Sequence, residues 1–366
     1  MKFLRNTWYV AAWAEQVQPG QLVARRILGE PIVIFRRGDG SLAALADVCP
    51  HRFAPLHEGK LLDGDRLQCP YHGLQFGADG KCAHNPHGNG RIVASMKVKS
   101  YHLVEKHTIA WIWMGDAEPD PSLIPDFSIL DTSPPEVTSK RDWLRMGANY
   151  LLITENLLDL SHVSFLHEGI LGNEETVAAK IEVEERGTTL WVSRIMPNVR
   201  VPGLFDLMFK RDGGRVDHWA IMRWDQPGCL LNNSGVTGIG APREAGSGIF
   251  GTHFLTPETE TTTLYHFCAV RQNPRSWGAE IDAEIRGQMS DMRRHAFEDQ
   301  DKLIIEAQQQ AILDPCVDTD RPIIQEIDAG PVRFRRILDR LIAEEAPASE
   351  GAPPRQEAHR SPLSLS

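Results

Sequence analysis

Short apolar runs separated by turn residues dominate the first third of the chain. Residues 31–35 are apolar and β-branched, Gly38-Asp39-Gly40 follows as a turn, and residues 42–48 are apolar again. Residues 109–113 show the alternating pattern of a strand. Strands of this length with frequent turns predict a small antiparallel β domain. We expect two Cys/His segments, at 49–51 and 69–72, to lie at hairpin tips of this domain.

Later in the chain the hydrophobic pattern changes to helical spacing. Residues 155–168 place leucines among polar residues, which predicts a helix that begins near Thr154 and ends near Glu168-Gly169. Residues 280–312 form a long amphipathic pattern that predicts a second helix. Residues 189–192 and 263–267 are expected to be strands between the two helices.

A proline-rich segment at 118–126 suggests a boundary between domains. We therefore expect an N-terminal domain at 1–118 and a second domain at 119–345. Residues 346–366 are rich in Ala, Pro, Ser and Glu, a composition typical of a disordered tail. A length of 366 residues suits two ordinary domains.

Composition narrows the class of protein. Hydrophobic residues make up 42% and charged residues 24% of the chain, as in soluble globular proteins. The net charge of −10 argues against nucleic acid or an anionic membrane as partner. The six cysteines form no disulfide framework, and neither a signal peptide nor a membrane span is visible. These features predict a cytoplasmic protein.

Two cysteine–histidine knuckles carry the first candidate chemistry. Cys49 and His51 form the first, and Cys69 and His72 form the second. Two thiolates and two imidazoles are the ligand set of a Rieske [2Fe–2S] cluster. A structural zinc ion could use the same atoms. Each knuckle mixes both ligand types, and this arrangement favours the cluster.

A second group of candidate metal-site residues consists of Asp159, His162 and His167 in the predicted helix 155–168. Two histidines and one carboxylate form the facial triad of non-haem Fe(II) oxygenases. Because five residues separate the histidines, a regular helix would turn them apart, so the helix must loosen or end between them. The carboxylate should come from helix 280–312, where the acidic candidates are Glu298, Asp299, Asp301 and Glu306. Spacing alone would assign these acids to a solvated face.

With both constellations in view, the chain resembles the Rieske non-haem iron oxygenases, in particular the oxygenase components that demethylate vanillate or dicamba or oxidise toluenesulfonate. The motifs that carry the resemblance are residues 5–11, 49–52, 69–74, 156–162 with His167, and 252–259. The resemblance covers about residues 1–345. The resemblance implies an α+β fold with a Rieske β-sandwich, followed by a helix-grip catalytic domain whose antiparallel sheet wraps a long C-terminal helix.

The resemblance also assigns roles to single residues. It implies that Asp301, with Glu306 following, completes the iron site, with Asp299 as the alternative. It implies that Asp159 hydrogen-bonds His72 of a neighbouring subunit in a homotrimer, so that electrons pass between the two metal centres. Asn156 is implied to lie near the iron, and Asn232 and His253 to contact the substrate.

The implied function is the terminal oxygenase component of a monooxygenase that hydroxylates a methyl group of a small aromatic acid. O-demethylation of a methoxybenzoate, with release of formaldehyde, is the expected reaction, with dioxygen as co-substrate. Alternatives are methyl or ring hydroxylation of another aromatic acid, for example a sulfonated toluene, a non-catalytic Rieske electron carrier, or a zinc-stapled binding protein. Residues 238–243 lack the glycine pattern of a nicotinamide site. A separate NAD(P)H-dependent flavin and iron–sulfur reductase is therefore expected.

Overall fold

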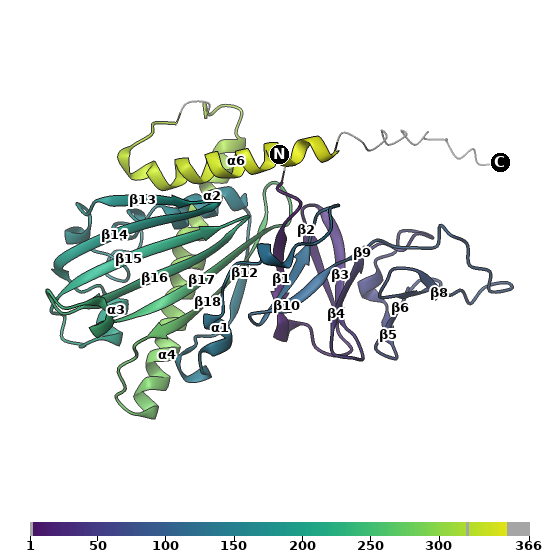
Figure 1. The fold of residues 1–366 in the computed structure, drawn as a ribbon, viewed down its shortest axis with the longest axis horizontal. Helices are drawn as coiled ribbons and strands as arrows, with labels where there is room; N and C mark the ends of the chain where they lie inside the picture. Colours follow the sequence, from purple (N-terminus) through teal and green to yellow (C-terminus); the bar gives the residue numbers. More distant parts are fainter. Residues whose placement is uncertain (1–2, 320–321, 350–366) are drawn as a thin grey trace.

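The computed structural model describes residues 3–319 and 322–349, and it shows two β-rich parts side by side (Figure 1). Smaller sheets build the N-terminal part, and one large sheet with helices builds the C-terminal part. This arrangement confirms the predicted α+β fold class.

Three small sheets form the N-terminal part. The first contains β1 (Trp8–Trp13), β11 (Ile109–Trp113) and β10 (Leu103–Lys106). The second contains β2 (Leu22–Ile27), β3 (Glu30–Arg36), β4 (Leu42–Ala46) and β9 (Ser100–Tyr101). The third contains β5 (Lys60–Leu62), β6 (Arg66–Gln68), β7 (Gln75–Gly77) and β8 (Cys82–His84). The strands predicted at 31–35, 42–48 and 109–113 are all present.

The prediction that both knuckles lie at hairpin tips is wrong for the first one. The second knuckle connects β6 to β7, which pair in antiparallel fashion. The first knuckle instead connects β4 to β5, and these strands belong to different sheets. The sheet that a strand joins depends on contacts distant in sequence. The local turn pattern therefore did not reveal that β4 and β5 belong to different sheets.

Seven antiparallel strands form the large sheet of the C-terminal part. Their order is β12 (Asp142–Met146), β18 (Thr263–Gln272), β17 (Ser247–Pro257), β16 (Cys229–Thr237), β15 (Arg215–Asp225), β14 (Thr189–Arg200) and β13 (Ile181–Arg186). The strands predicted at 189–192 and 263–267 are therefore the beginnings of β14 and β18.

A long helical run crosses the sheet, as predicted for residues 280–312. It comprises α4 (Ala279–Arg294), a π-helical segment (His295–Asp301) and α5 (Lys302–Leu313). The remaining helices are α1 (Ile129–Thr132), α2 (Tyr150–Leu158), α3 (Gly203–Met208) and α6 (Ala329–Ser349). Side chains of α2, α6, the sheet and the π segment share one hydrophobic core that includes Leu157, Leu190, Phe297 and Phe334.

The predicted helix at 155–168 has different limits in the structure. Helix α2 begins after Asn149, whose side chain accepts a hydrogen bond from the Leu151 amide at 2.9 Å and so caps the helix. Thr154 lies inside the helix. The helix ends at Leu158, because Asp159 leaves the helical conformation and its carboxylate accepts the Ser161 amide at 2.9 Å.

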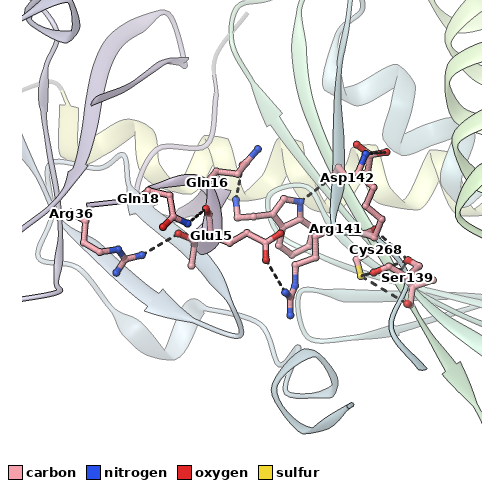
Figure 2. Close-up of polar contacts among 12 residues, drawn as sticks. Glu15, Gln16, Gln18, Arg36, Ser139, Arg141, Asp142 and Cys268 are labelled. Carbon is pink, nitrogen blue, oxygen red and sulfur yellow. Dashed lines mark hydrogen bonds and ion pairs between the residues drawn. The ribbon is translucent and has the colours of Figure 1, made fainter. Parts of the chain in front are cut away.

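The two parts of the molecule share a hydrophobic cluster. Polar contacts also join them (Figure 2). The Trp13 indole donates to the carbonyl of Asp142 at 3.0 Å, and Arg141 pairs with Glu15 at 3.0 Å. The boundary at 118/119 falls in the segment between β11 and β12, and it stays a prediction.

Helix α6 reaches Ser349, into the segment where we expected the tail to begin at 346. The rest of the expected tail lies outside the described residues. In the described ranges, every helix is too short or too polar to cross a membrane.

Candidate metal centres and substrate cavity

Both cysteine–histidine knuckles adopt the same backbone turn. The Cys49 amide donates to the carbonyl of Ala54 at 2.9 Å, and the Cys69 amide donates to that of Leu74 at 2.8 Å. Each turn contains one residue with positive φ, Phe53 at 58° and Gly73 at 73°. The two knuckles are therefore equivalent loops that present their side chains to the same space.

The four knuckle side chains combine buried sulfurs with accessible imidazoles. Cys49 and Cys69 are buried, His51 is exposed and His72 is half-buried. The two imidazole rings lie 4.5 Å apart. His87 donates from Nε2 to the carbonyl of His72 at 2.8 Å and so braces the second knuckle.

The knuckle geometry fits a two-iron cluster better than a single zinc ion. Ligands of one ion lie close together. Among the described residues, the knuckle donors do not form a group of three or more ligand atoms within 4.8 Å of one another, so they are spread more widely than one ion requires. Burial raises the pKa of the Cys49 thiol to about 11. A thiolate in this apolar position therefore needs a metal cation to stabilise it.

The compact group that the structure does contain is His162, His167 and Asp301. The Asp301 Oδ1 atom lies 3.2 Å from His167 Nε2 and 3.7 Å from His162 Nε2. His167 and Asp301 are 1% and 4% exposed. The structure thus brings together the three residues that were expected to form a facial triad.

The outer nitrogens of both imidazoles have hydrogen-bond acceptors. His162 Nδ1 donates to the backbone carbonyl of Asp159, and His167 Nδ1 donates to Gln300 Oε1 at 2.7 Å. With the proton on Nδ1, each Nε2 faces Asp301 and can offer its lone pair to a metal ion. This is the tautomer that a metal-binding histidine requires.

Electrostatics at the triad also suits a cation. Burial lowers the pKa of His162, which favours its neutral form. Burial acts the same way on His167, but the hydrogen bond and charge of Asp301 outweigh it and raise the pKa of this histidine. The carboxylate therefore favours positive charge beside it, whether a proton or a metal ion carries that charge.

The π-helical segment determines which acidic residue reaches the triad. Asp301 ends this segment, is buried, and accepts a hydrogen bond from Asn156 Nδ2 at 3.2 Å. Asp299, the alternative, is exposed and pairs with His295 at 2.8 Å. Glu306 accepts the Gly147 amide at 2.6 Å and thereby ties the long helix to the segment before α2.

Arg194 of β14 holds the loop that carries the two histidines, a role that the sequence did not suggest. Arg194 is 1% exposed. It donates to the carbonyl of Leu160 at 2.8 Å and of Val177 at 3.0 Å, and to the Ser164 hydroxyl at 3.3 Å. Arg194 therefore holds together the non-helical segment that follows α2.

We expect Arg194→Met to lower iron occupancy of the triad while the Rieske absorption stays unchanged. The substitution leaves buried carbonyls without donors, which should cost about 2–4 kcal/mol of stability. Metal analysis per cluster and thermal unfolding would measure both effects. Full iron content in a variant of wild-type stability would contradict this role.

A cavity beside the triad is lined mainly by apolar side chains. Asn232 of β16 and His253 of β17, the two expected substrate contacts, both line it. Arg293 of α4 also lines it, and sequence spacing had not singled this residue out. The structure therefore places a few polar groups and three metal-ligand candidates around one largely apolar space, as in many small-molecule sites.

Asp159 lies on the other side of His162, in a surface depression that also contains Asn156 and Phe165. Within one chain its carboxylate bonds Ser161, and among the described residues it has no hydrogen bond to His72. The expected contact between Asp159 and His72 would thus require a second subunit.

Comparison with known proteins agrees with both centres. Residues 7–102 match the Rieske [2Fe-2S] domain family, and residues 146–344 match the vanillate O-demethylase oxygenase C-terminal domain family. The oxygenase component of chloroacetanilide N-alkylformylase from Rhizorhabdus wittichii is 36% identical, over 94% of this chain and 97% of the relative. The oxygenase component of dicamba O-demethylase from Stenotrophomonas maltophilia is 37% identical, over 94% of this chain and 100% of the relative.

Solved structures show the same fold. The crystal structure of dicamba monooxygenase bound to 3,6-dichlorosalicylic acid superposes with a TM-score of 0.86 at 35% identity, covering 94% of this chain and 99% of that one. These matches exclude the zinc-stapled and carrier-only alternatives, because both domains of an oxygenase are present. The chain belongs to the Rieske non-haem iron oxygenases, as a monooxygenase component that uses a [2Fe–2S] cluster, a mononuclear non-haem iron and dioxygen.

Proposed function

We propose that this chain is the terminal oxygenase of a multicomponent system that hydroxylates a methyl group of a small aromatic acid, with O-demethylation of a methoxybenzoate as the reaction. One observation carries the proposal: the triad of His162, His167 and Asp301 borders a largely apolar cavity that contains a few polar groups. An apolar wall suits an aromatic ring, and the polar groups suit its acidic substituent.

We assign the [2Fe–2S] cluster to Cys49, His51, Cys69 and His72, and the iron to the triad. When bound, the cluster supplies single electrons and the iron supplies activation of dioxygen. The chain's own residues supply orientation. Asp159 and Gln300 fix the two imidazole tautomers, and Asn156 donates to Asp301 and holds its carboxylate in place.

The cavity's contribution is to position the methyl group and to exclude water. Apolar residues such as Leu157, Ile249 and Phe297 line it. They offer no hydrogen bonds, so water gains little by entering and the ring gains contact area. A methoxy group hydroxylated at its carbon becomes a hemiacetal, which breaks down to a phenol and formaldehyde.

Formaldehyde release tests the proposed reaction. Purified enzyme, supplied with a surrogate reductase, should convert at least one methoxybenzoate to the phenol with one formaldehyde per dioxygen consumed. Conversion of 4-toluenesulfonate to its hydroxymethyl product, with no formaldehyde from any methoxybenzoate, would favour methyl hydroxylation instead. Turnover of neither class would refute the proposal.

A separate reductase should supply the electrons, because the relatives named above are components of larger systems. We propose an NAD(P)H-dependent flavin and iron–sulfur protein, and a cytoplasmic location where NAD(P)H is available. Purified chain with NADH alone should therefore show no turnover, and addition of a reductase should start it. Sustained oxidation of NADH by the chain alone would contradict this prediction.

We also propose a homotrimer in which Asp159 of one subunit meets His72 of the next. Figure 1 shows sheet β5–β8, with the knuckles, at the end of the molecule away from α2. Exposed apolar side chains border both places: Phe53 and Tyr71 beside the cluster are 77% and 64% exposed, and Phe165 and Ile323 beside Asp159 are 72% and 88% exposed. Such patches favour association. Light scattering of the purified protein should give three times the chain mass.

A further inference from the structure

Arg293 is a buried cation without an ionic partner. It lies in the last turn of α4, is 5% exposed and lines the substrate cavity. Among the described residues no carboxylate forms an ion pair with it, and its Nη2 atom has no hydrogen-bond partner. A guanidinium keeps its charge at all physiological pH values, and a buried unpaired charge is costly.

Two aromatic rings compensate part of this cost. The guanidinium carbon lies 5.7 Å from the ring centre of Phe267 and 5.3 Å from that of Phe297. These rings can stabilise the cation through their faces. They cannot accept hydrogen bonds as strongly as an anion, so the donor atom at Nη2 is left for a ligand.

His253 presents a second donor to the same space. Its Nδ1 lies 2.6 Å from the Tyr265 hydroxyl, and its buried Nε2 has no hydrogen-bond partner in the part of the chain that the structure describes. Burial lowers the pKa of His253 well below its usual range, so the ring is neutral. When the Tyr265 hydroxyl donates to Nδ1, the ring proton lies on Nε2 and is free to bind an acceptor.

Asn232 is oriented as a third donor. Its Oδ1 atom accepts a hydrogen bond from the Ser234 hydroxyl, which leaves its amide NH2 group available. Gly251 marks where the three side chains meet. A Cβ atom added at Gly251 would lie 3.3 Å from His253 Nε2, 3.5 Å from Asn232 Cβ and 3.6 Å from Arg293 Nη2.

We propose that Arg293 is a specificity-determining residue that pairs with an ionised oxyanion, a carboxylate or sulfonate, on the aromatic substrate. This inference rests on the proposed function and deepens it. His253 and Asn232 add hydrogen bonds to the same group, while the positive charge of Arg293 makes ionisation a requirement. Neutral methoxyarenes, including amides of the same shape, are therefore poor ligands.

Calorimetry on the holoenzyme, without reductase, tests the requirement for charge. The probes are 2-, 3- and 4-methoxybenzoate, each compared with its benzamide, and 3-methoxybenzenesulfonate, which separates the two oxyanion classes. At least one acid or the sulfonate should bind wild type about 10- to 100-fold more tightly than the neutral amide. Arg293→Met should remove this preference by weakening acid binding alone, and Arg293→Lys should retain part of it.

The matched control is Arg294→Met. Arg294 is the adjacent arginine, but it pairs with Asp142 and Glu298, both at 2.7 Å. Its loss removes the same charge outside the cavity and should leave the preference unchanged. If wild type binds no anionic probe more tightly than its amide, or if Arg293→Met weakens acid and amide equally, the proposal is overturned.

Gly251→Ala provides a variant that leaves Arg293 in place. Its added methyl group occupies the space beside the three side chains, so acid binding should weaken while the Rieske absorption and the melting temperature stay close to wild type. Unchanged acid affinity would contradict the location of the subsite. An enzyme that prefers anions but releases no formaldehyde would refute demethylation and leave the subsite standing, so the two proposals fail separately.

Discussion

Replacing Asp301 with alanine is expected to abolish turnover while the Rieske spectrum remains that of the wild type. Asp301 is the carboxylate of the triad, and its Oδ1 lies within 3.7 Å of both imidazole Nε2 atoms. Without it the site has two neutral nitrogens and no negative charge to hold a divalent cation. Turnover should fall at least about 1000-fold, which corresponds to about 4 kcal/mol. Metal analysis should find the cluster iron and little else.

Asp299→Ala is the control for this prediction. Asp299 lies two residues earlier in the same π segment, but it is exposed and pairs with His295. Its loss should change stability by less than about 0.5 kcal/mol and leave iron content and turnover near wild type. If Asp299→Ala loses the iron and Asp301→Ala retains it, the assignment of the third ligand is wrong.

Asp159→Asn is expected to have the second largest effect, with turnover about 100-fold lower and with iron content unchanged. The backbone carbonyl of Asp159 accepts from His162 Nδ1, and an asparagine retains this contact. The substitution removes only the negative charge that, in the proposed trimer, faces His72 of the next subunit. Stopped-flow measurement of cluster oxidation in a single turnover would show whether the loss lies between the two centres.

Glu155→Gln is the matched control in the same surface depression. Glu155 pairs with Arg335 at 2.5 Å, so its loss should cost about 1 kcal/mol of stability at most, with little effect on cluster oxidation. Equal slowing in both variants would indicate a general effect of charge in the depression. Wild-type turnover in Asp159→Asn would refute the role of this carboxylate.

Much of the architecture could be predicted because it depends on residues close together in sequence. The strands at 31–35 and 109–113 follow from short apolar runs between turns, and the long helix follows from its amphipathic pattern. The knuckles could be identified for the same reason, since each places its two ligands within four residues. The limits of α2 were missed, because the hydrophobic pattern does not show the Asn149 cap or the turn at Asp159.

The candidate iron site was predicted only with the help of the family resemblance. Spacing within the long helix favours Asp299 and Asp301 about equally as members of a solvated face. The π segment decides between them by turning Asp301 into the core, where Asn156 donates to it, and leaving Asp299 in solvent. The local sequence pattern does not predict the π-helical segment.

The sequence by itself determined which ligand types this protein carries and how they are grouped, because thiolate, imidazole and carboxylate chemistry belongs to the side chains themselves. Only the tertiary structure decided which carboxylate meets the histidines, and that Arg293 is buried in the same cavity wall with its Nη2 atom unpaired among the described residues. The physical reason is that burial and pairing arise between strands and helices far apart in the chain. The free energy of a charge depends on those surroundings rather than on its neighbours in sequence.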